Sequence, residues 1–126
     1  MKIINTDKSP KAIGPYSQAV KFNQLLFTSG QIPIEPSTGL MVSQNFKDQV
    51  YQCLINIKGI LEEENLSLNH IIKLTVYVVD LNNFSQLNEV FKDFFKGNYP
   101  ARSAVEVSRL PKDSQVEIEA VCSYEN

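Results

Sequence analysis

The sequence lacks the cysteine and histidine content that metal centres and disulfide frameworks require. Its 126 residues include two cysteines, Cys53 and Cys122, and one histidine, His70. Two cysteines cannot staple a chain this long, and with one histidine they fall short of an ordinary zinc-binding set. We therefore expect no metal site, and we expect both cysteines to pack in the core as small hydrophobes.

Long apolar runs and glycine-rich phosphate loops are also missing. No run approaches the roughly 20 apolar residues that span a bilayer, and the N-terminal segment has no apolar stretch typical of a signal peptide. Without a phosphate loop, no nucleotide cofactor is indicated. Because no linker or repeat divides the chain, we expect a single domain over residues 1–126. The default expectation is a cytoplasmic protein without cofactor or membrane contact.

Arginine is the scarcest charged residue. Twelve Lys and Arg residues against fourteen Asp and Glu residues give a formal net charge of −2. Such a chain has no global positive field to hold a polyanion, which argues against nucleic-acid binding. The arginines are Arg102 and Arg109, and every other basic residue of the twelve is a lysine.

Periodicity and turn residues predict two helices and about five strands. The expected elements are strands at 16–22 and 25–29, a helix at 45–64, a strand at 70–79, a helix at 83–96, and strands at 104–108 and 115–124. The first two strands and the last two are each expected to form a hairpin. This content favours an α+β sandwich in which both helices cover one face of a mixed sheet. A second copy of the chain could cover the other face.

Local signals refine these elements. Asn45 is expected to cap the first helix, and Gly59 interrupts it at a cost of about 1 kcal/mol that nothing in the pattern explains. Asn83 is expected to cap the second helix, with Gln86 completing a capping box. Alternation along 70–79 predicts one face made of Ile72, Leu74, Val76 and Val78, and an opposite face made of Lys73, Thr75, Tyr77 and Val79.

Asn88 is out of place on the second helix. A helical wheel puts it between Phe84, Phe91 and Phe95, in the middle of the apolar face. A buried amide without partners costs roughly 1–3 kcal/mol. Asn88 is therefore either a structural amide bonded to backbone or an amide that projects into a pocket.

Arg102 stands out because lysine serves elsewhere on the predicted surface. A planar guanidinium grips a carboxylate or phosphate through two hydrogen bonds, which an ammonium group cannot do. The residue is therefore either such a clamp or one half of an ion pair. Arg102 opens the strand segment predicted around 104–108, and Arg109 ends it beside Leu110-Pro111, where a structural role is favoured.

Glu117 and Glu119 alternate along the last predicted strand. Their side chains point to one face, roughly 6.5–7 Å apart, while their neighbours point to the other. Most such pairs form a solvated strand face. A pair in which one member is partly desolvated can also perform acid–base chemistry.

Several segments together resemble the Rid family, formerly called YjgF, and most closely its RidA branch. The resemblance covers essentially the whole chain, and its most specific part is Pro-Ala-Arg-Ser followed by Leu-Pro-Lys and a Glu-Ile-Glu-Ala strand. The segments are residues 12–19, 28–33, 79–82, 99–103, 109–113 and 117–120. The resemblance implies a chorismate-mutase-like α+β fold, a homotrimer, and sites in the clefts between subunits.

The implied activity is cofactor-free hydrolysis of reactive enamines and imines, such as 2-aminoacrylate and 2-iminobutanoate, to 2-oxo acids and ammonia. Arg102 matches the carboxylate clamp of the family, and Glu117 matches the residue that orients or activates water. The backbone at Gly30 matches the part that seats the substrate, and pocket-lining positions match Tyr16, Ser29 and Asn88. Ala104 stands where relatives often carry cysteine, so only its backbone atoms could contribute.

Two other functions are compatible with the same residues. A non-catalytic protein could sense 2-oxo acids through the Arg102 pocket, since it would share every binding residue with the enzyme. Relatives have also been described as translation inhibitors or ribonucleases, but the net charge of −2 and the two arginines count against an RNA-directed role.

Overall fold

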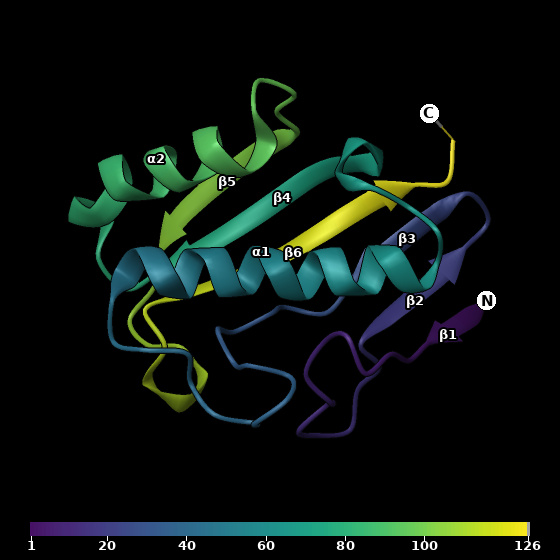
Figure 1. Ribbon diagram of the computed structural model, residues 1–126, viewed down its shortest axis with the longest axis horizontal. Coiled ribbons are helices and arrows are strands. Elements are labelled where there is room, and N and C mark those ends of the chain that lie inside the picture. The colour runs from purple at the N-terminus through teal and green to yellow at the C-terminus, as the bar shows by residue number, and fades with distance from the viewer. Residues whose placement is uncertain (126) are drawn as a thin grey trace.

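Six strands form one mixed sheet in the computed structural model, which describes residues 1–125 (Figure 1). The strands are β1 (Lys2–Ile4), β2 (Ala19–Phe22), β3 (Leu25–Thr28), β4 (Ile71–Val78), β5 (Ala101–Glu106) and β6 (Val116–Ser123). Their order across the sheet is β1-β2-β3-β6-β4-β5, and β4–β5 is the parallel pair among antiparallel ones. The helices are α1 (Phe46–Glu63) and α2 (Phe84–Phe95).

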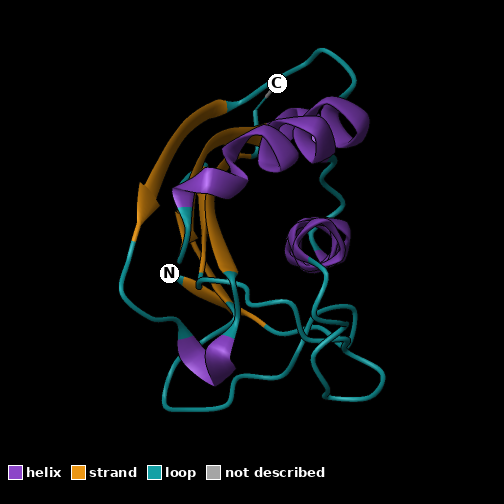
Figure 2. Cartoon of the chain, turned by 90° about the vertical axis from the view of Figure 1, so that its left-hand side faces the viewer, coloured by secondary structure: helices purple, strands orange, loops and turns teal. Residues whose placement is uncertain are grey.

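Both helices lie on the same side of the sheet, as Figure 2 shows in a view turned from Figure 1. The prediction of two helices on one face of a mixed sheet is therefore confirmed. Between helices and sheet lies a single apolar cluster to which α1, α2 and the inward faces of β3, β4 and β6 contribute. No helix among residues 1–125 is long and apolar enough to cross a membrane.

The predicted closing hairpin is wrong. β5 does not pair with β6; it runs parallel to β4 at the edge of the sheet, and β6 lies between β3 and β4. Chain segment β4-α2-β5 is a crossover, because parallel neighbours need a long connection and here the helix supplies it. The short strand β1, which pairs with β2, was also not predicted.

The face assignment of β4 is wrong at its start. A register irregularity between Ile71 and Lys73 places Ile71 in the buried position and leaves Ile72 46% exposed. From Leu74 onward, the alternation is as predicted, with Leu74, Val76 and Val78 buried. A bulge adds one residue to a strand and so reverses the faces on one side of it.

Helix α1 begins as predicted, and α2 does not. The Asn45 side chain accepts a 3.0 Å hydrogen bond from the backbone N–H of Asp48. Asn83 makes no side-chain capping bond to the described backbone, because it closes a short 3-10 turn, Leu81–Asn83. Asp80 caps that turn instead, accepting from the N–H of Asn82 at 2.9 Å. The predicted capping box with Gln86 is therefore absent from the described structure.

Contact with the N-terminal arm explains Gly59. This glycine is buried, and a Cβ atom built on it would overlap the backbone carbonyl group of Lys8. The arm is held there by Gln18, whose amide accepts from the N–H of Thr6 at 2.7 Å and donates to the carbonyl oxygen of Pro10 at 2.8 Å. Glycine at this position thus allows the arm to lie directly on α1.

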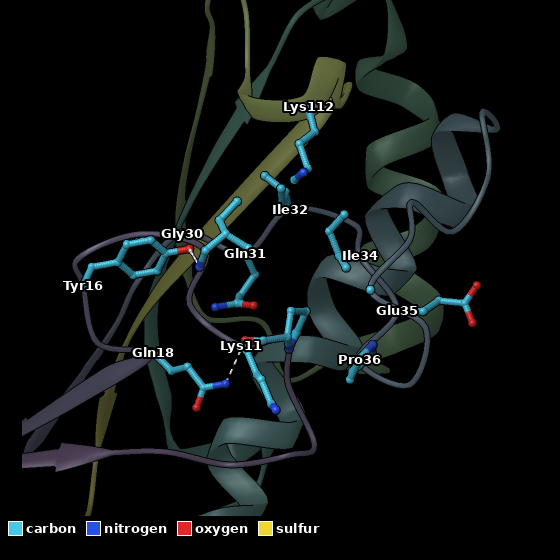
Figure 3. A pocket seen from close by; sticks show the side chains of 13 residues that line it. Lys11, Tyr16, Gln18, Gly30, Gln31, Ile32, Ile34, Glu35, Pro36 and Lys112 are labelled. Atoms are coloured by element: carbon cyan, nitrogen blue, oxygen red, sulfur yellow. Dashed lines mark hydrogen bonds between the residues drawn. The ribbon is translucent and has the colours of Figure 1, made fainter.

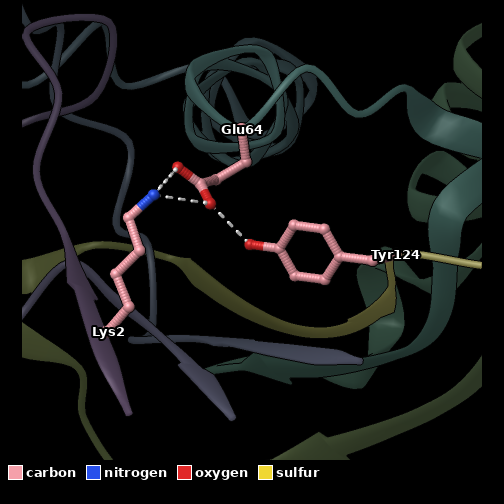
Figure 4. Close-up of polar contacts among 3 residues, drawn as sticks. All are labelled: Lys2, Glu64 and Tyr124. Carbon is pink, nitrogen blue, oxygen red and sulfur yellow. Dashed lines mark hydrogen bonds and ion pairs between the residues drawn. The ribbon is translucent and has the colours of Figure 1, made fainter. Parts of the chain in front are cut away.

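A polar cluster of Lys2, Glu64 and Tyr124 joins the ends of three elements (Figure 4). The Glu64 carboxylate, directly after α1, accepts a 2.7 Å hydrogen bond from the Tyr124 hydroxyl and pairs with the Lys2 ammonium group at 3.3 Å. The Glu64 side chain is only 10% exposed, so the pair is partly shielded from water. This polar cluster fixes the end of α1 against β1 and the segment that follows β6.

Replacing Gly59 with alanine tests the contact between the arm and α1. Alanine should gain about 1 kcal/mol in helix propensity, but the overlap with a backbone carbonyl should cost more. We expect a net loss of about 1–3 kcal/mol in the free energy of unfolding, measured by urea denaturation at fixed protein concentration. Lys58→Ala, one residue away and exposed, should change it by less than about 0.5 kcal/mol. A Gly59→Ala variant as stable as wild type would contradict the packing explanation.

Candidate functional site

Arg102 lies on the edge strand β5 with its side chain toward α2. Its guanidinium carbon is 4.9 Å from the ring centroid of Phe91 and 5.2 Å from that of Phe84. Burial lowers the pKa of Arg102, but a guanidinium group stays charged at any physiological pH. No carboxylate among residues 1–125 lies within ion-pair distance of it. The group is therefore a half-buried cation on an aromatic surface, and it is not part of an internal ion pair.

A shallow pocket of about 360 Å³ surrounds this guanidinium. Its lining comes from α2, β5 and the segment between them: Asn88, Phe91, Lys92, Tyr99, Pro100 and Arg102. Asn88 is half-buried at the rim of the helix face, whereas Leu87, Val90 and Phe91 form its centre. Asn88 thus lies between the phenylalanines as the helical wheel predicts, but it is half-buried and lines this pocket together with Arg102.

Glu117 sits on β6 with its carboxylate packed against Gly30. A Cβ atom on Gly30 would come within 2.8 Å of the Glu117 carboxyl carbon and one of its oxygens. Burial is the main cause that raises the pKa of Glu117, and the neighbouring charge of Glu119 raises it further. Of the two possibilities for this pair, partial desolvation of one member is the one that the structure supports.

The segment that carries Gly30 is fixed to β6 by backbone hydrogen bonds. The N–H of Gln31 donates to the carbonyl oxygen of Ile118 at 2.8 Å, and the N–H of Ile118 donates back at 3.1 Å. The Ser29 hydroxyl donates to the Ser17 carbonyl oxygen at 2.5 Å. Since this bond occupies the hydroxyl proton, Ser29 holds the loop in place. The glycine and the carboxylate therefore form one rigid unit.

Tyr16 lies in the loop before β2, where its hydroxyl accepts a 3.2 Å hydrogen bond from the N–H of Ile13. Its ring is 48% exposed and lines a cavity together with Gly30. Ala104 pairs with Val76 in the sheet, and its methyl group packs on the core from the same side as Arg102. Arg109 forms a surface ion pair with Asp113 at 3.3 Å, in agreement with the structural role favoured for it.

The sheet separates the predicted site residues into two groups. Arg102 is the register partner of Leu74, which is buried on the helix side, whereas Glu117 is the partner of Tyr77 on the opposite face. Because register partners in a sheet project to the same face, Arg102 and Glu117 lie on opposite faces of one chain. We call Arg102, Asn88 and Ala104 the clamp half, and Tyr16, Ser29, Gly30 and Glu117 the carboxylate half.

Neither cysteine is an accessible nucleophile. Cys53 and Cys122 are both buried, and burial raises the pKa of each thiol, that of Cys122 to about 12. Residues 1–125 contain no group of three or more His, Cys, Asp or Glu side chains arranged to hold a metal ion.

The aromatic surface under Arg102 was not predicted from the sequence: Phe91 belongs to the core and also contacts the guanidinium. Phe84 and Phe91 are seven residues apart on α2, so they project from one face of the helix with Asn88 between them. That spacing was visible in the sequence. What could not be seen was that β5 would run beside this helix and bring Arg102 to it.

Comparisons with known proteins agree with this architecture. The family model described as Endoribonuclease L-PSP matches residues 6–123. RutC family protein PH0854 of Pyrococcus horikoshii is 54% identical over 124 residues, which cover 98% of each chain. An Escherichia coli protein named "Putative reactive intermediate deaminase TdcF" is 49% identical over 123 residues, or 95% of each chain. The crystal structure of E. coli TdcF with bound serine matches 98% of both chains with a TM-score of 0.93 and 48% identity. By sequence and by fold, this chain belongs to the Rid (YjgF) family.

Proposed function

We propose that the protein hydrolyses reactive 2-imino acids and their enamine tautomers to 2-oxo acids and ammonia. The observation that carries the proposal is the pairing of chemistries on the two faces: a half-buried guanidinium without an internal carboxylate partner, and a partly desolvated carboxylate. The first suits the carboxylate that every such substrate carries. The second suits the transfer of protons to and from water.

Binding begins with the substrate carboxylate at Arg102. Two parallel N–H···O bonds from the guanidinium would fix both its position and its plane. The Phe84 and Phe91 rings hold the guanidinium in place and exclude water from one side of it. The bound serine described for the TdcF relative supports a small molecule with a carboxylate as the class of ligand.

The chemistry needs one water and a group that moves protons. Glu117 removes a proton from water as the water oxygen bonds to the imine carbon and the C=N electron pair moves to nitrogen, and it returns that proton to the nitrogen. Glu117 next takes the proton of the new hydroxyl group and passes it to the nitrogen as the C–N bond breaks, so that ammonia leaves with the C–N electron pair and the carboxylate is regenerated. The net reaction converts one imine and one water into one 2-oxo acid and one ammonia. Burial, and next the charge of Glu119, raise the pKa of Glu117, and a raised pKa favours this role because it makes the carboxylate a better acceptor of protons.

The clamp half of one chain and the carboxylate half of another would make the complete site. Within one chain the sheet keeps Arg102 and Glu117 on opposite faces. The outer face that carries Glu117 also exposes apolar side chains, with Phe27 and Val105 each 43% exposed, which is typical of a surface covered by another copy. A homotrimer with sites between neighbouring subunits satisfies both observations.

RNA cleavage is not proposed, although the matching family model is described as an endoribonuclease. The net charge of −2 provides no electrostatic footprint for a polyanion.

Substituting Arg102 tests the clamp. With the imine released by a pyridoxal-phosphate-dependent threonine dehydratase as substrate, we expect Arg102→Ala to lower kcat/KM by about 100-fold or more. Arg102→Lys should lose most of the activity too, because an ammonium group cannot form the bidentate contact. The loss of imine absorbance measures the rate. Arg109→Ala, which breaks only a surface ion pair, should match wild type; equal activity of Arg102→Ala and wild type would disprove the clamp.

Replacing Glu117 with glutamine separates an enzyme from a sensor. The amide keeps the size of the side chain but cannot take a proton, so kcat should fall by about 100-fold or more. Affinity for 2-oxobutanoate, measured by calorimetry, should stay within about threefold of wild type because the clamp is intact. Unchanged turnover in Glu117→Gln would contradict the proposed proton transfer. Wild-type protein that binds 2-oxobutanoate without accelerating imine decay would favour the sensor.

Mixing two inactive variants tests whether sites lie between subunits. In a cyclic trimer of Arg102→Ala and Glu117→Gln chains, every mixed assembly contains one site with both functional residues. Random assembly at equal amounts should therefore restore roughly a quarter of wild-type activity. Light scattering checks the trimer. Mixed assemblies that remain as inactive as the separate variants would show that the two halves do not meet.

A further inference from the structure

A separate cavity of about 220 Å³ lies between the N-terminal arm and the loop that follows β3 (Figure 3). Its walls are mainly apolar and include Ile13, Ile32, Ile34, Pro10 and Pro36. Ile32 and Ile34 are buried, so the cavity reaches into the body of the protein. The cavity shares Tyr16 and Gly30 with the carboxylate half but does not include Arg102 or Glu117. Neither the clamp nor the proposed proton transfer accounts for it.

The charged side chains around the cavity favour an anion. Lys11 and Lys112 both line it, and no carboxylate of residues 1–125 lies within ion-pair distance of either ammonium group. Glu35 also belongs to the lining, but its carboxylate points away from the cavity in Figure 3. Lys112 extends from the turn Pro111–Asp113 toward Ile32 in the same view. The cavity is therefore apolar inside and carries positive charge at its rim.

The backbone that presents Lys112 is in an unfavourable conformation. Lys112 and Asp113 both have a φ of 56°, in the left-handed region that disfavours residues other than glycine. Strained positions of this kind persist where the surrounding structure enforces them, and they concentrate at binding sites. Here the strained turn places an ammonium group at the mouth of an apolar cavity.

Gln31 provides a buried polar group inside the cavity. The residue is only 5% exposed, and its Oε1 accepts a 3.1 Å hydrogen bond from the Ser9 hydroxyl. Its Nε2 reaches the Ser29 carbonyl oxygen at 3.4 Å, a long contact that leaves the amide able to donate to another acceptor. A ligand with an oxygen atom at this position would complete the hydrogen bonding of Gln31.

We infer that this cavity binds a small aliphatic carboxylate of five or six carbons. Its hydrocarbon chain would pack on Ile32 and Ile34, and its carboxylate would meet Lys112. The volume of about 220 Å³ corresponds to about seven water-sized groups, which matches the heavy atoms of such a molecule. The inference goes beyond the proposed reaction, since the ligand needs neither an imine nor a 2-oxo group.

Hexanoate binding to protein with methyl-labelled isoleucines tests the inference. In NMR titrations, hexanoate should shift the Ile32 and Ile34 methyl signals saturably and leave those of exposed Ile55 and Ile72 unchanged. The dissociation constant in Arg102→Ala should lie within about threefold of wild type, although that variant is expected to lose turnover. Hexan-1-ol, which lacks the charge, should bind more weakly.

Two lysine variants provide the matched control. Lys112→Met keeps the apolar stem and removes the charge, so the dissociation constant for hexanoate should rise by about fivefold to tenfold. Lys58→Met, on the exposed surface of α1, should bind hexanoate like wild type. Unchanged affinity in Lys112→Met, or no methyl shift at roughly 10 mM ligand, overturns the inference. Loss of binding in Arg102→Ala would assign hexanoate to the clamp and overturn it as well.

Discussion

The alternation of side chains along β6 is the constraint on which the rest of the structure depends. Val116, Ile118, Ala120 and Cys122 enter the core, and the residues between them face outward. β6 pairs with β3 on one side and β4 on the other, so its inward side chains complete the apolar layer under α1. The same period of two places Glu117 on the outer face, where the loop at Gly30 covers it. The alternation along β6 therefore determines both which side chains form the core and where the Glu117 carboxylate lies.

The same alternation places the two groups of predicted site residues on opposite faces of the sheet. Edge strand β5 brings Arg102 to the aromatic surface of α2, on the helix side of the sheet. A strand with a period of two cannot turn this guanidinium toward Glu117 without also expelling its apolar neighbours from the core. In the proposed function, the two halves come from different chains, because the sheet keeps them on opposite faces of one chain. The sidedness of the sheet, more than any single contact, is the reason for proposing a site between subunits.

Sequence reasoning succeeded where the pattern was local and failed where it depended on distant partners. The cap at Asn45, the first helix itself and the position of Glu117 opposite its apolar neighbours were predicted from local spacing. The β4–β5 pairing was missed, because a parallel crossover and a hairpin begin with similar strand signals. Gly59 had no explanation until the arm was seen against it, since such a contact joins residues about fifty positions apart. The cavity beside Gln31 could not be predicted for the same reason, because segments that are separate in the sequence come together to form it.

Because both cysteines are buried, the described surface of this protein has no thiol that alkylating reagents can readily reach. Burial keeps both thiols protonated at neutral pH, and a protonated thiol is a poor nucleophile. A single cysteine introduced on the surface would therefore be the only readily alkylated position among the described residues. At half-buried Ala104, on the Arg102 side of β5, an introduced cysteine would be labelled more slowly than on the surface, and its labelling rate would report on how accessible the clamp half is. A thiol at this position could in this way be studied as an addition to a background without competing accessible thiols.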